Sequence, residues 1–219
     1  MSIAIENFVK AIYNNNSHDA RNTKPGIIAK KLGVSNAAAT DMAKKLAIKG
    51  LLNYEKYQEL QLTDEGKKMA LNIVRKHRLW EAFLFKMFDL SLHDIHKEAE
   101  LLEHQTSDLL ADKISEYLGH PKFDPHGDPI PNADGEITTT DTSISLSNAE
   151  EGKTYIISRL MSDDKEFFEF CAHQKLKYGH EIKVSKQFKI NKMTELSVEN
   201  NIILLNEDFS TLIYVNAIN

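Results

Sequence analysis

The sequence predicts a mainly α protein with a small β domain towards its C-terminal end. Three features predict it: a helix-turn-helix pattern followed by a β-hairpin, long helical patterns in the middle of the chain, and short apolar stretches between turn residues after them. Helices repeat at about 3.6 residues and strands at 2, so the periodicity separates these regions. We expect a winged helix-turn-helix, a helical segment and a small β-barrel-like domain.

The beginning of the chain carries the helix-turn-helix pattern. Apolar residues at helical spacing predict a first helix, and Pro25 suits the first turn of a second. The second helix stops at Gly33, and Ser35 or Asn36 can cap a third. A short helix, a tight turn and another helix form a helix-turn-helix.

Exposed residues at the start of the third helix are the candidates for reading DNA bases. Asn can bond an adenine edge, Ser and Thr can bond bases or phosphates, and Ala can meet the methyl group of thymine. The basic residues Lys44, Lys45 and Arg21 suit phosphate contacts. The expected DNA-binding residues are Ser35, Asn36, Ala37, Thr40, Asp41 and Lys44. A three-helix core that binds no DNA is the alternative.

The pattern changes period after the third helix. Alternation of apolar and polar residues predicts a β-hairpin, the wing, over residues 51–62. Thr63 then caps a long helix that continues to Met87, with Asp64 and Glu65 in its first turn. Two further helices, which Ser91 and Ser107 can cap, are rich in leucine. They suit a dimerising bundle as well as an ordinary core.

The remaining part of the chain, residues 121–219, begins with a proline-rich segment. Four of the five prolines lie between residues 121 and 131, and polar residues continue to about Ala149, which predicts a tether. Beyond it, short apolar stretches over residues 155–160, 182–184, 202–205 and 212–215, with Gly152 and Gly179 at turns, indicate the β domain, and residues 167–171 are expected to be helical.

Composition and charge suit a cytoplasmic protein with a nucleic-acid partner. The single cysteine excludes an internal disulfide, and no apolar run is long enough to cross a membrane. The net charge of −5 divides into +5 over residues 1–75 (12 basic and 7 acidic), −10 over residues 76–152 (6 and 16) and zero over residues 153–219 (9 and 9). The basic segment favours a polyanion and the acidic segment a cation.

Six residues with metal-binding side chains lie at helical spacing in the middle helices. They are His77, Glu81, His96, Glu100, Glu103 and His104. Residues three or four apart share one helix face, so His77 aligns with Glu81 and His96 aligns with Glu100. Mixed nitrogen and oxygen ligands suit first-row divalent metals. Solvated surface pairs that bind no metal are the alternative.

The segments KHRLWEAFL, IHKEAELLEH and DPHGDPIP resemble the diphtheria toxin repressor and manganese transport regulator family of metal-dependent winged-helix repressors. The resemblance covers essentially the whole chain. It implies a homodimeric transcriptional repressor, not an enzyme, that binds palindromic operator DNA and no membrane. The implied domains are a DNA-binding domain (1–75), a metal-binding and dimerisation domain (76–120), a tether (121–149) and an SH3-like (FeoA-like) domain (150–219).

The resemblance also implies two metal ions per subunit. The ligands of the primary site would be Asn7, Glu100, Glu103 and His104. Those of the ancillary site would be His77, Glu81 and His96. The C-terminal domain of long family members can add an acidic ligand, here Asp164 or its rival Glu166.

The resemblance bears on the choice of metal as well. Glu100 stands where iron-sensing members have cysteine, as in the manganese-sensing branch, and a carboxylate favours manganese over softer metals. Asn7 replaces the methionine of iron sensors and the aspartate of manganese sensors with a neutral amide. We expect a manganese-responsive repressor of metal-uptake genes, with Mn²⁺ as cofactor and Fe²⁺ as the alternative.

Two other classes of protein stay open. One is a winged-helix regulator that senses an organic ligand, with the His and Glu pairs only on the surface. The other is a metallo-hydrolase, although the sequence has no phosphate-binding glycine loop or nucleophile elbow.

Overall fold

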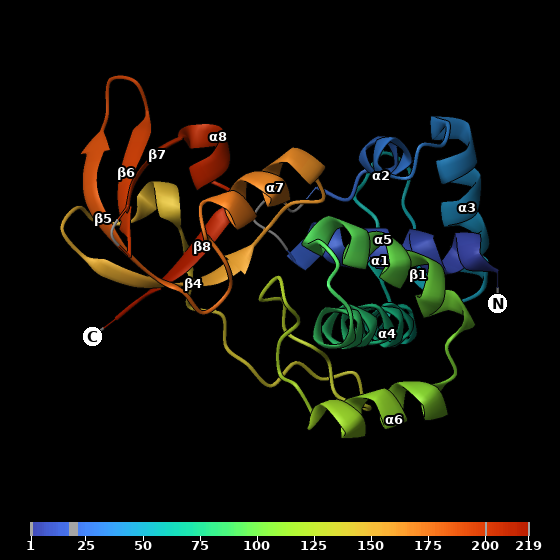
Figure 1. Cartoon of the computed structure of the whole chain (residues 1–219). Helices are drawn as coiled ribbons and strands as arrows, with labels where there is room; N and C mark the ends of the chain where they lie inside the picture. The colour runs from blue at the N-terminus through green and yellow to red at the C-terminus, as the bar shows by residue number, and fades with distance from the viewer. Residues whose placement is uncertain (1, 18–21, 200, 219) are drawn as a thin grey trace. The chain divides into compact units, whose positions relative to one another are not determined.

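The computed structural model describes residues 2–17, 22–199 and 201–218, which divide into two compact units (Figure 1). The N-terminal unit contains Met1–His77, Glu100–Lys113 and Pro131–Thr138. The sheet unit contains Arg78–Ala99, Ile114–Ile130 and Thr139–Asn219. Three middle helices run through these boundaries, so the four-part division expected from the sequence stays a prediction.

The N-terminal unit begins with the predicted helix-turn-helix, made of α1 (Ile3–Ser17), α2 (Pro25–Lys31) and α3 (Asn36–Ile48). The hydroxyl of Ser35 caps α3 by accepting the N–H of Ala38 at 3.1 Å. The apolar faces of the three helices form one core, which includes Phe8, Val9, Ile12, Ile28, Ala39, Ala43 and Leu46. The apolar stripe therefore buries one side of α3 and leaves the other side exposed.

The wing is a short antiparallel hairpin of β1 (Leu52–Asn53) and β2 (Gln61–Leu62). Leu52 pairs with Leu62, so the predicted hairpin is present, with two paired residues on each strand. Tyr57 at its tip is exposed and has a φ of 70°.

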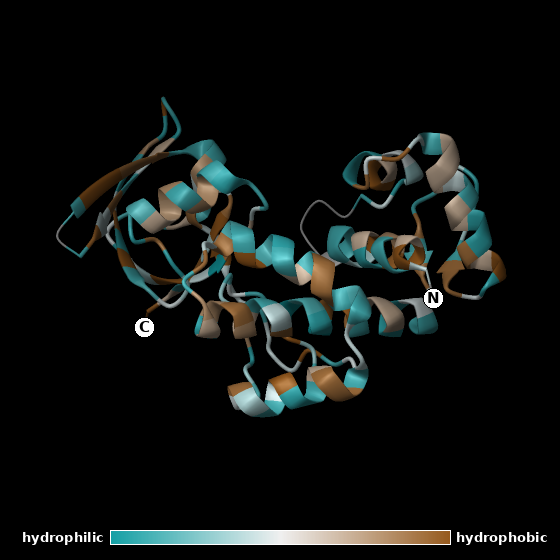
Figure 2. Ribbon diagram, turned by 45° about the vertical axis from the view of Figure 1, so that its right-hand side comes forward, coloured by the Kyte–Doolittle hydropathy of each residue, from teal (hydrophilic) through white to brown (hydrophobic). Residues whose placement is uncertain are grey.

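The middle of the chain forms α4 (Asp64–Met87), α5 (Leu92–Leu102) and α6 (Asp108–Leu118). Each helix begins at a predicted cap, because the hydroxyls of Thr63, Ser91 and Ser107 accept the backbone N–H of Gly66, Asp94 and Leu110. A 3₁₀ turn, η1 (Glu103–Gln105), follows α5 where the sequence predicted continuous helix. Figure 2 shows hydrophilic and hydrophobic residues interspersed along the helices, as amphipathic patterning requires.

The sheet unit contains a six-stranded antiparallel sheet with the order β3-β8-β4-β5-β6-β7. The strands are β3 (Ile144–Ser145), β4 (Thr154–Leu160), β5 (Glu181–Phe188), β6 (Met193–Val198), β7 (Asn201–Asn206) and β8 (Ile213–Ala217). Two helices, α7 (Lys165–His173) and α8 (Glu207–Ser210), belong to the same unit. The apolar stretches predicted β4, β5, β7, β8 and α7. They did not predict β6, whose buried Thr194 interrupts the apolar signal.

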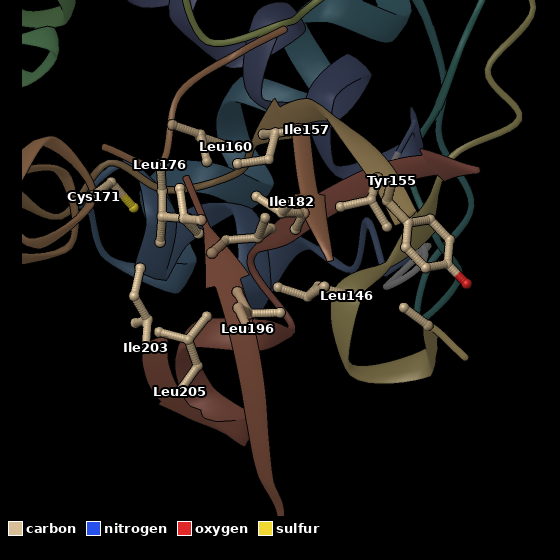
Figure 3. Close-up of a cluster of buried hydrophobic side chains, with 14 of the residues drawn as sticks. Leu146, Tyr155, Ile157, Leu160, Cys171, Leu176, Ile182, Leu196, Ile203 and Leu205 are labelled. Carbon is tan, nitrogen blue, oxygen red and sulfur yellow. The ribbon is translucent and has the colours of Figure 1, made fainter. Parts of the chain in front are cut away.

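The core of the sheet unit is drawn in Figure 3. Its labelled side chains are Leu146, Tyr155, Ile157, Leu160, Cys171, Leu176, Ile182, Leu196, Ile203 and Leu205. Leu146 is fully buried although it lies in the expected tether, so the end of that segment packs into the domain. Burial raises the pKa of the Cys171 thiol to about 12, which keeps this side chain neutral and unreactive. Within the described residues, no helix has both the length and the apolar character needed to cross a membrane.

Candidate metal centre

The predicted metal-binding side chains gather in two clusters, one in each unit. The acid cluster, in the N-terminal unit, contains Glu6, Asn7 and Lys10 of α1, His77 of α4, Glu100 of α5, and Glu103 and His104 of η1. The histidine cluster, in the sheet unit, contains Glu81 of α4, His96 of α5 and His126 of the proline-rich segment.

One side of the acid cluster is organised around Lys10. The lysine Nζ donates to Glu100 Oε1 at 2.7 Å and to Glu103 Oε2 at 2.6 Å, and it lies 3.3 Å from His77 Nδ1. His77 Nδ1 also lies 2.6 Å from Glu103 Oε2. One ligand atom from each of His77, Glu100 and Glu103 lies within 4.8 Å of the others, a spacing that one metal ion could bridge.

The acid cluster also contains buried polar atoms that have no hydrogen-bond partner among the described residues. They are Asn7 Oδ1, Glu103 Oε1 and His104 Nε2. A buried polar atom without a partner costs about 1–3 kcal/mol, so such atoms are uncommon and call for an explanation. Amide oxygen, carboxylate oxygen and imidazole nitrogen are all ligands of first-row divalent metals. These residues therefore fit a metal ion.

His104 is held in the orientation that a metal ligand needs. Its Nδ1 lies 2.6 Å from Glu6 Oε2, and its Nε2 lies 3.3 Å from Glu103 Oε1. A carboxylate on Nδ1 fixes the proton there and leaves the lone pair of Nε2 to bind a cation. Glu6 would therefore act on a bound metal through His104.

The 3₁₀ turn at the end of α5 explains how two consecutive residues are both buried. Thr106 closes this turn by donating its hydroxyl to the carbonyl of Leu102 at 2.7 Å. The side chains of Glu103 and His104 are 0% and 5% exposed. The sequence predicted both as ligands, but it did not predict Glu6 and Lys10. The available signal was helical spacing: Lys10 lies three residues after Asn7 and four residues after Glu6.

The histidine cluster is organised around the buried carboxylate of Glu81. Its Oε1 lies 2.9 Å from His96 Nδ1 and 3.3 Å from His126 Nε2. Neither ring nitrogen of His126 has a hydrogen-bond partner in the described part of the chain. One carboxylate and two imidazoles form a mixed ligand set for a divalent metal. His77, predicted for the same site, lies one helical turn before Glu81 on α4.

The position of His126 is fixed by a turn that its flanking residues stabilise. One carboxylate oxygen of Asp124 accepts the backbone N–H of His126 and of Asp128, both at 2.9 Å. Gly127 has a φ of +92°, and a Cβ there would lie 2.1 Å from the carbonyl oxygen of Ser158. Arg78 pairs with Asp128 at 3.3 Å. The segment DPHGDP was noticed in the sequence, but its histidine was not assigned to the site.

Burial and neighbouring carboxylates compete in setting the charge of this turn. Burial alone lowers the pKa of His126, but Glu81, and then Asp124 and Asp128, outweigh it and raise the pKa. The pKa of Asp124 lies well above its ordinary value, because burial and the nearby Glu81 and Asp128 all disfavour its charged form. The cluster thus concentrates negative potential that a cation would neutralise.

Asp164 has a structural position at the beginning of α7. One of its carboxylate oxygens accepts the N–H of Phe167 at 2.9 Å, which makes Asp164 the N-cap of that helix. Its role as an additional metal ligand, and that of its rival Glu166 in the first turn, stay predictions.

The residues predicted to read DNA lie along the first turns of α3. Ser35, Asn36, Ala37, Asp41 and Lys44 are exposed, while Thr40 is half-buried. The Thr40 hydroxyl donates to the carbonyl of Asn36 at 2.8 Å, and Asp41 pairs with Lys45 at 2.8 Å. Arg21 lies outside the described residues. The exposed side of α3 therefore carries the small polar side chains that were expected there.

Family models match the first three-fifths of the chain. Residues 1–60 match the model described as "Iron dependent repressor, N-terminal DNA binding domain". Residues 63–132 match the model described as "Iron dependent repressor, metal binding and dimerisation domain".

Individual relatives extend this similarity to most of the chain. The diphtheria toxin repressor of Corynebacterium efficiens is 27% identical over 166 residues, 72% of each protein. A structure described as a manganese-dependent transcriptional repressor in complex with manganese is 29% identical, has a TM-score of 0.90, and covers 97% of this chain and 99% of its own. The structure of ScaR with bound Zn²⁺ is 31% identical, has a TM-score of 0.81, and covers 98% of this chain and 99% of its own.

Proposed function

Because this chain belongs to the family of iron-dependent repressors, which are metal-dependent DNA-binding proteins, we propose that it represses metal-uptake genes in response to manganese. The observation that carries the proposal is the set of buried ligand atoms on Asn7, Glu103 and His104 that have no hydrogen-bond partner among the described residues. The proposed compartment is the cytoplasm, where the operator DNA lies. Members of this family regulate transcription and are not enzymes.

The proposed mechanism is linkage between metal binding and the position of the DNA-reading helices. Asn7 lies on α1, which packs in the core of the helix-turn-helix, while Glu103 and His104 lie after α5. A cation bound by these three side chains would supply the positive charge that holds the two segments together. Ligand binding that favours one arrangement shifts the population towards it, and DNA must then tighten metal binding in return.

A dimer would present two copies of α3 to DNA. Each unit of the chain has exposed apolar residues that are candidates for the dimer interface. Leu101 and Leu109 of the N-terminal unit are both 70% exposed, and Phe85 and Phe88 of the sheet unit are also exposed. Large exposed apolar side chains commonly mark interfaces with a partner. A twofold dimer whose recognition helices are about 34 Å apart would read a palindromic operator.

The proposed preference for manganese rests on oxygen ligands. Glu100 supplies a carboxylate to the acid cluster, and Asn7 supplies a neutral amide oxygen. Oxygen ligands suit manganese, whereas thiolates select softer metals, although intrinsic affinity rises from manganese through iron to later metals. Fe²⁺ is therefore the alternative activating ion. We propose two ions per subunit, one in each cluster.

A gel-shift titration tests the proposed function. The probe is DNA selected by this protein from a random library in the presence of Mn²⁺, incubated with metal-free protein and increasing Mn²⁺, Fe²⁺ or Zn²⁺. We expect the DNA affinity to rise with Mn²⁺ and to return to its metal-free value when a chelator is added. DNA affinity that a chelator leaves unchanged would exclude a metal sensor and favour the metal-independent regulator.

Glu100→Cys should change the ranking of the activating metals. The substitution replaces a hard carboxylate with a thiolate, so Zn²⁺, Co²⁺ and Fe²⁺ should gain affinity relative to Mn²⁺. Competition titrations with a fluorescent metal indicator measure this ratio, and Glu100→Gln is the control that removes only the charge. A metal ranking identical in the Cys variant and the unmodified protein would contradict the argument for manganese.

A further inference from the structure

The acid cluster contains a positive charge of its own. Lys10 Nζ lies 2.7 Å from Glu100 Oε1, 2.6 Å from Glu103 Oε2 and 3.3 Å from His77 Nδ1, so it contacts every member of a triad that has metal-binding geometry. The lysine side chain is 10% exposed and that of Glu103 is 0% exposed. Screening by water is therefore weak between Lys10 and Glu103, whereas Glu100, whose side chain is 42% exposed, is more solvated.

We propose that the ammonium group of Lys10 is a built-in cation, which occupies the His77–Glu100–Glu103 triad and limits the acid cluster to a single metal ion. The proposal rests on the proposed function, because it presumes that the cluster binds metal at all. The proposal about Lys10 concerns how many metal ions the acid cluster binds and on which side of the cluster they bind.

The two oxygens of Glu103 divide the cluster into two sides: the lysine side around Oε2, and the opposite side around Oε1. Oε2 contacts Lys10 and His77, while Oε1 lies 3.3 Å from His104 Nε2 and has no hydrogen-bond partner among the described residues. Glu103 Oε1 and His104 Nε2 thus belong to a side that the lysine does not use, and the buried Oδ1 of Asn7, on the same helix as Lys10, is the third candidate ligand atom. A metal ion is expected on that side.

A metal ion and the ammonium cannot share the lysine side. First-row metals bind carboxylate oxygen and imidazole nitrogen at about 2.0–2.2 Å. The ammonium already lies at hydrogen-bond distance from one oxygen of each glutamate in the triad. An ion bound to the same atoms would place two positive charges within contact distance in a buried site, so it would have to displace the lysine.

Lys10 would also hold the cluster together in the metal-free protein. It joins α1 to α5 and η1 through two ion pairs, and it offsets part of the repulsion between Glu100 and Glu103. The ammonium of Lys10 thus permanently offsets negative charge on the lysine side of the cluster. Only the side with Asn7, Glu103 Oε1 and His104 responds to the metal concentration.

The test is the number of Mn²⁺ ions bound per chain by the unmodified protein, Lys10→Met and Lys10→Glu. Lys10→Met keeps most of the apolar stem and removes the charge, while Lys10→Glu adds a fourth ligand to the triad. We expect both variants to bind one more Mn²⁺ per chain than the unmodified protein, and Lys10→Glu to bind it more tightly. The histidine cluster contributes equally to all three proteins and cancels in the difference.

Electron paramagnetic resonance of bound Mn²⁺ gives a second readout. Neighbouring Mn²⁺ ions broaden each other's spectrum, so we expect the Lys10 variants, with a second ion in the acid cluster, to give a broader spectrum than the unmodified protein. Lys153→Glu is the matched control: it makes the same charge change at an exposed lysine that pairs with Glu150, and it should match the unmodified protein in both measurements.

The outcomes separate the two proposals. Suppose that the unmodified protein binds Mn²⁺ and that the Lys10 variants fold but bind no additional ion. This result would overturn the role of Lys10 and leave the proposed function intact. Two Mn²⁺ ions within the acid cluster of the unmodified protein, seen by anomalous diffraction, would overturn it directly, even if the variants failed to fold. No Mn²⁺ binding by any of the proteins would refute the proposed function, and this inference with it.

Discussion

Replacing His104 with alanine should weaken Mn²⁺ binding to the acid cluster by more than about 100-fold and abolish metal-dependent DNA binding. The imidazole is buried, its Nδ1 is engaged by Glu6, and its Nε2 has no hydrogen-bond partner among the described residues. Loss of an outer-shell partner alone typically costs 10–100-fold in metal affinity, so loss of a ligand should cost more. Calorimetric titration with Mn²⁺ and the gel-shift measurement report the two effects.

The matched control for this variant is His173→Ala. His173 is exposed at the end of α7, outside both clusters, so its replacement should leave metal and DNA binding unchanged. Circular dichroism of both variants checks that they are folded. If folded His104→Ala still bound DNA in a manganese-dependent way with unchanged midpoint, the proposed metal site would be in the wrong place.

Asn36→Ala should weaken binding to the selected DNA by roughly 5- to 150-fold and relax the base preference at one position of each half-site. Asn36 is exposed at the first residue of α3, where side chains of a helix-turn-helix reach base edges. A bidentate bond from asparagine to adenine is worth about 1–3 kcal/mol of discrimination. Binding curves on the selected sequence and on singly substituted probes measure both effects.

Lys44→Ala provides the contrast for the asparagine variant, because a phosphate contact carries no sequence information. It should weaken binding about equally on all probes and reduce the salt dependence of the affinity. Asn191→Ala, in an exposed turn of the sheet unit, is the neutral control. A uniform loss across probes for Asn36→Ala would mean that Asn36 contacts the DNA backbone and does not read a base.

Local signals in the sequence were enough to predict much of the fold. The caps Ser35, Thr63, Ser91 and Ser107 bond backbone groups three residues away, so their effect does not depend on the rest of the protein. The winged helix-turn-helix and the helices after it followed from these caps and from apolar periodicity. The resemblance to known repressors supplied the grouping of metal ligands, which helical spacing alone left open.

The features that were not predicted depend on contacts between distant segments. The sequence analysis did not assign a role to Lys10, because only packing places it against residues about ninety positions later. His126 lies in a proline-rich segment whose composition suggested a tether. Its position follows from the carboxylate of Asp124 and from the close approach of Ser158 to Gly127. Neither constraint has a periodic signature in the sequence.

The most direct test of the central claim is anomalous diffraction from crystals grown with Mn²⁺. The account predicts an anomalous peak in the acid cluster bound by Asn7 Oδ1, Glu103 Oε1, His104 Nε2 and the second carboxylate oxygen of Glu100. The Lys10 ammonium should be retained against Glu100 Oε1 and Glu103 Oε2. The proposed metal site would be contradicted if the acid cluster showed no anomalous peak although the same protein bound DNA only when manganese was present.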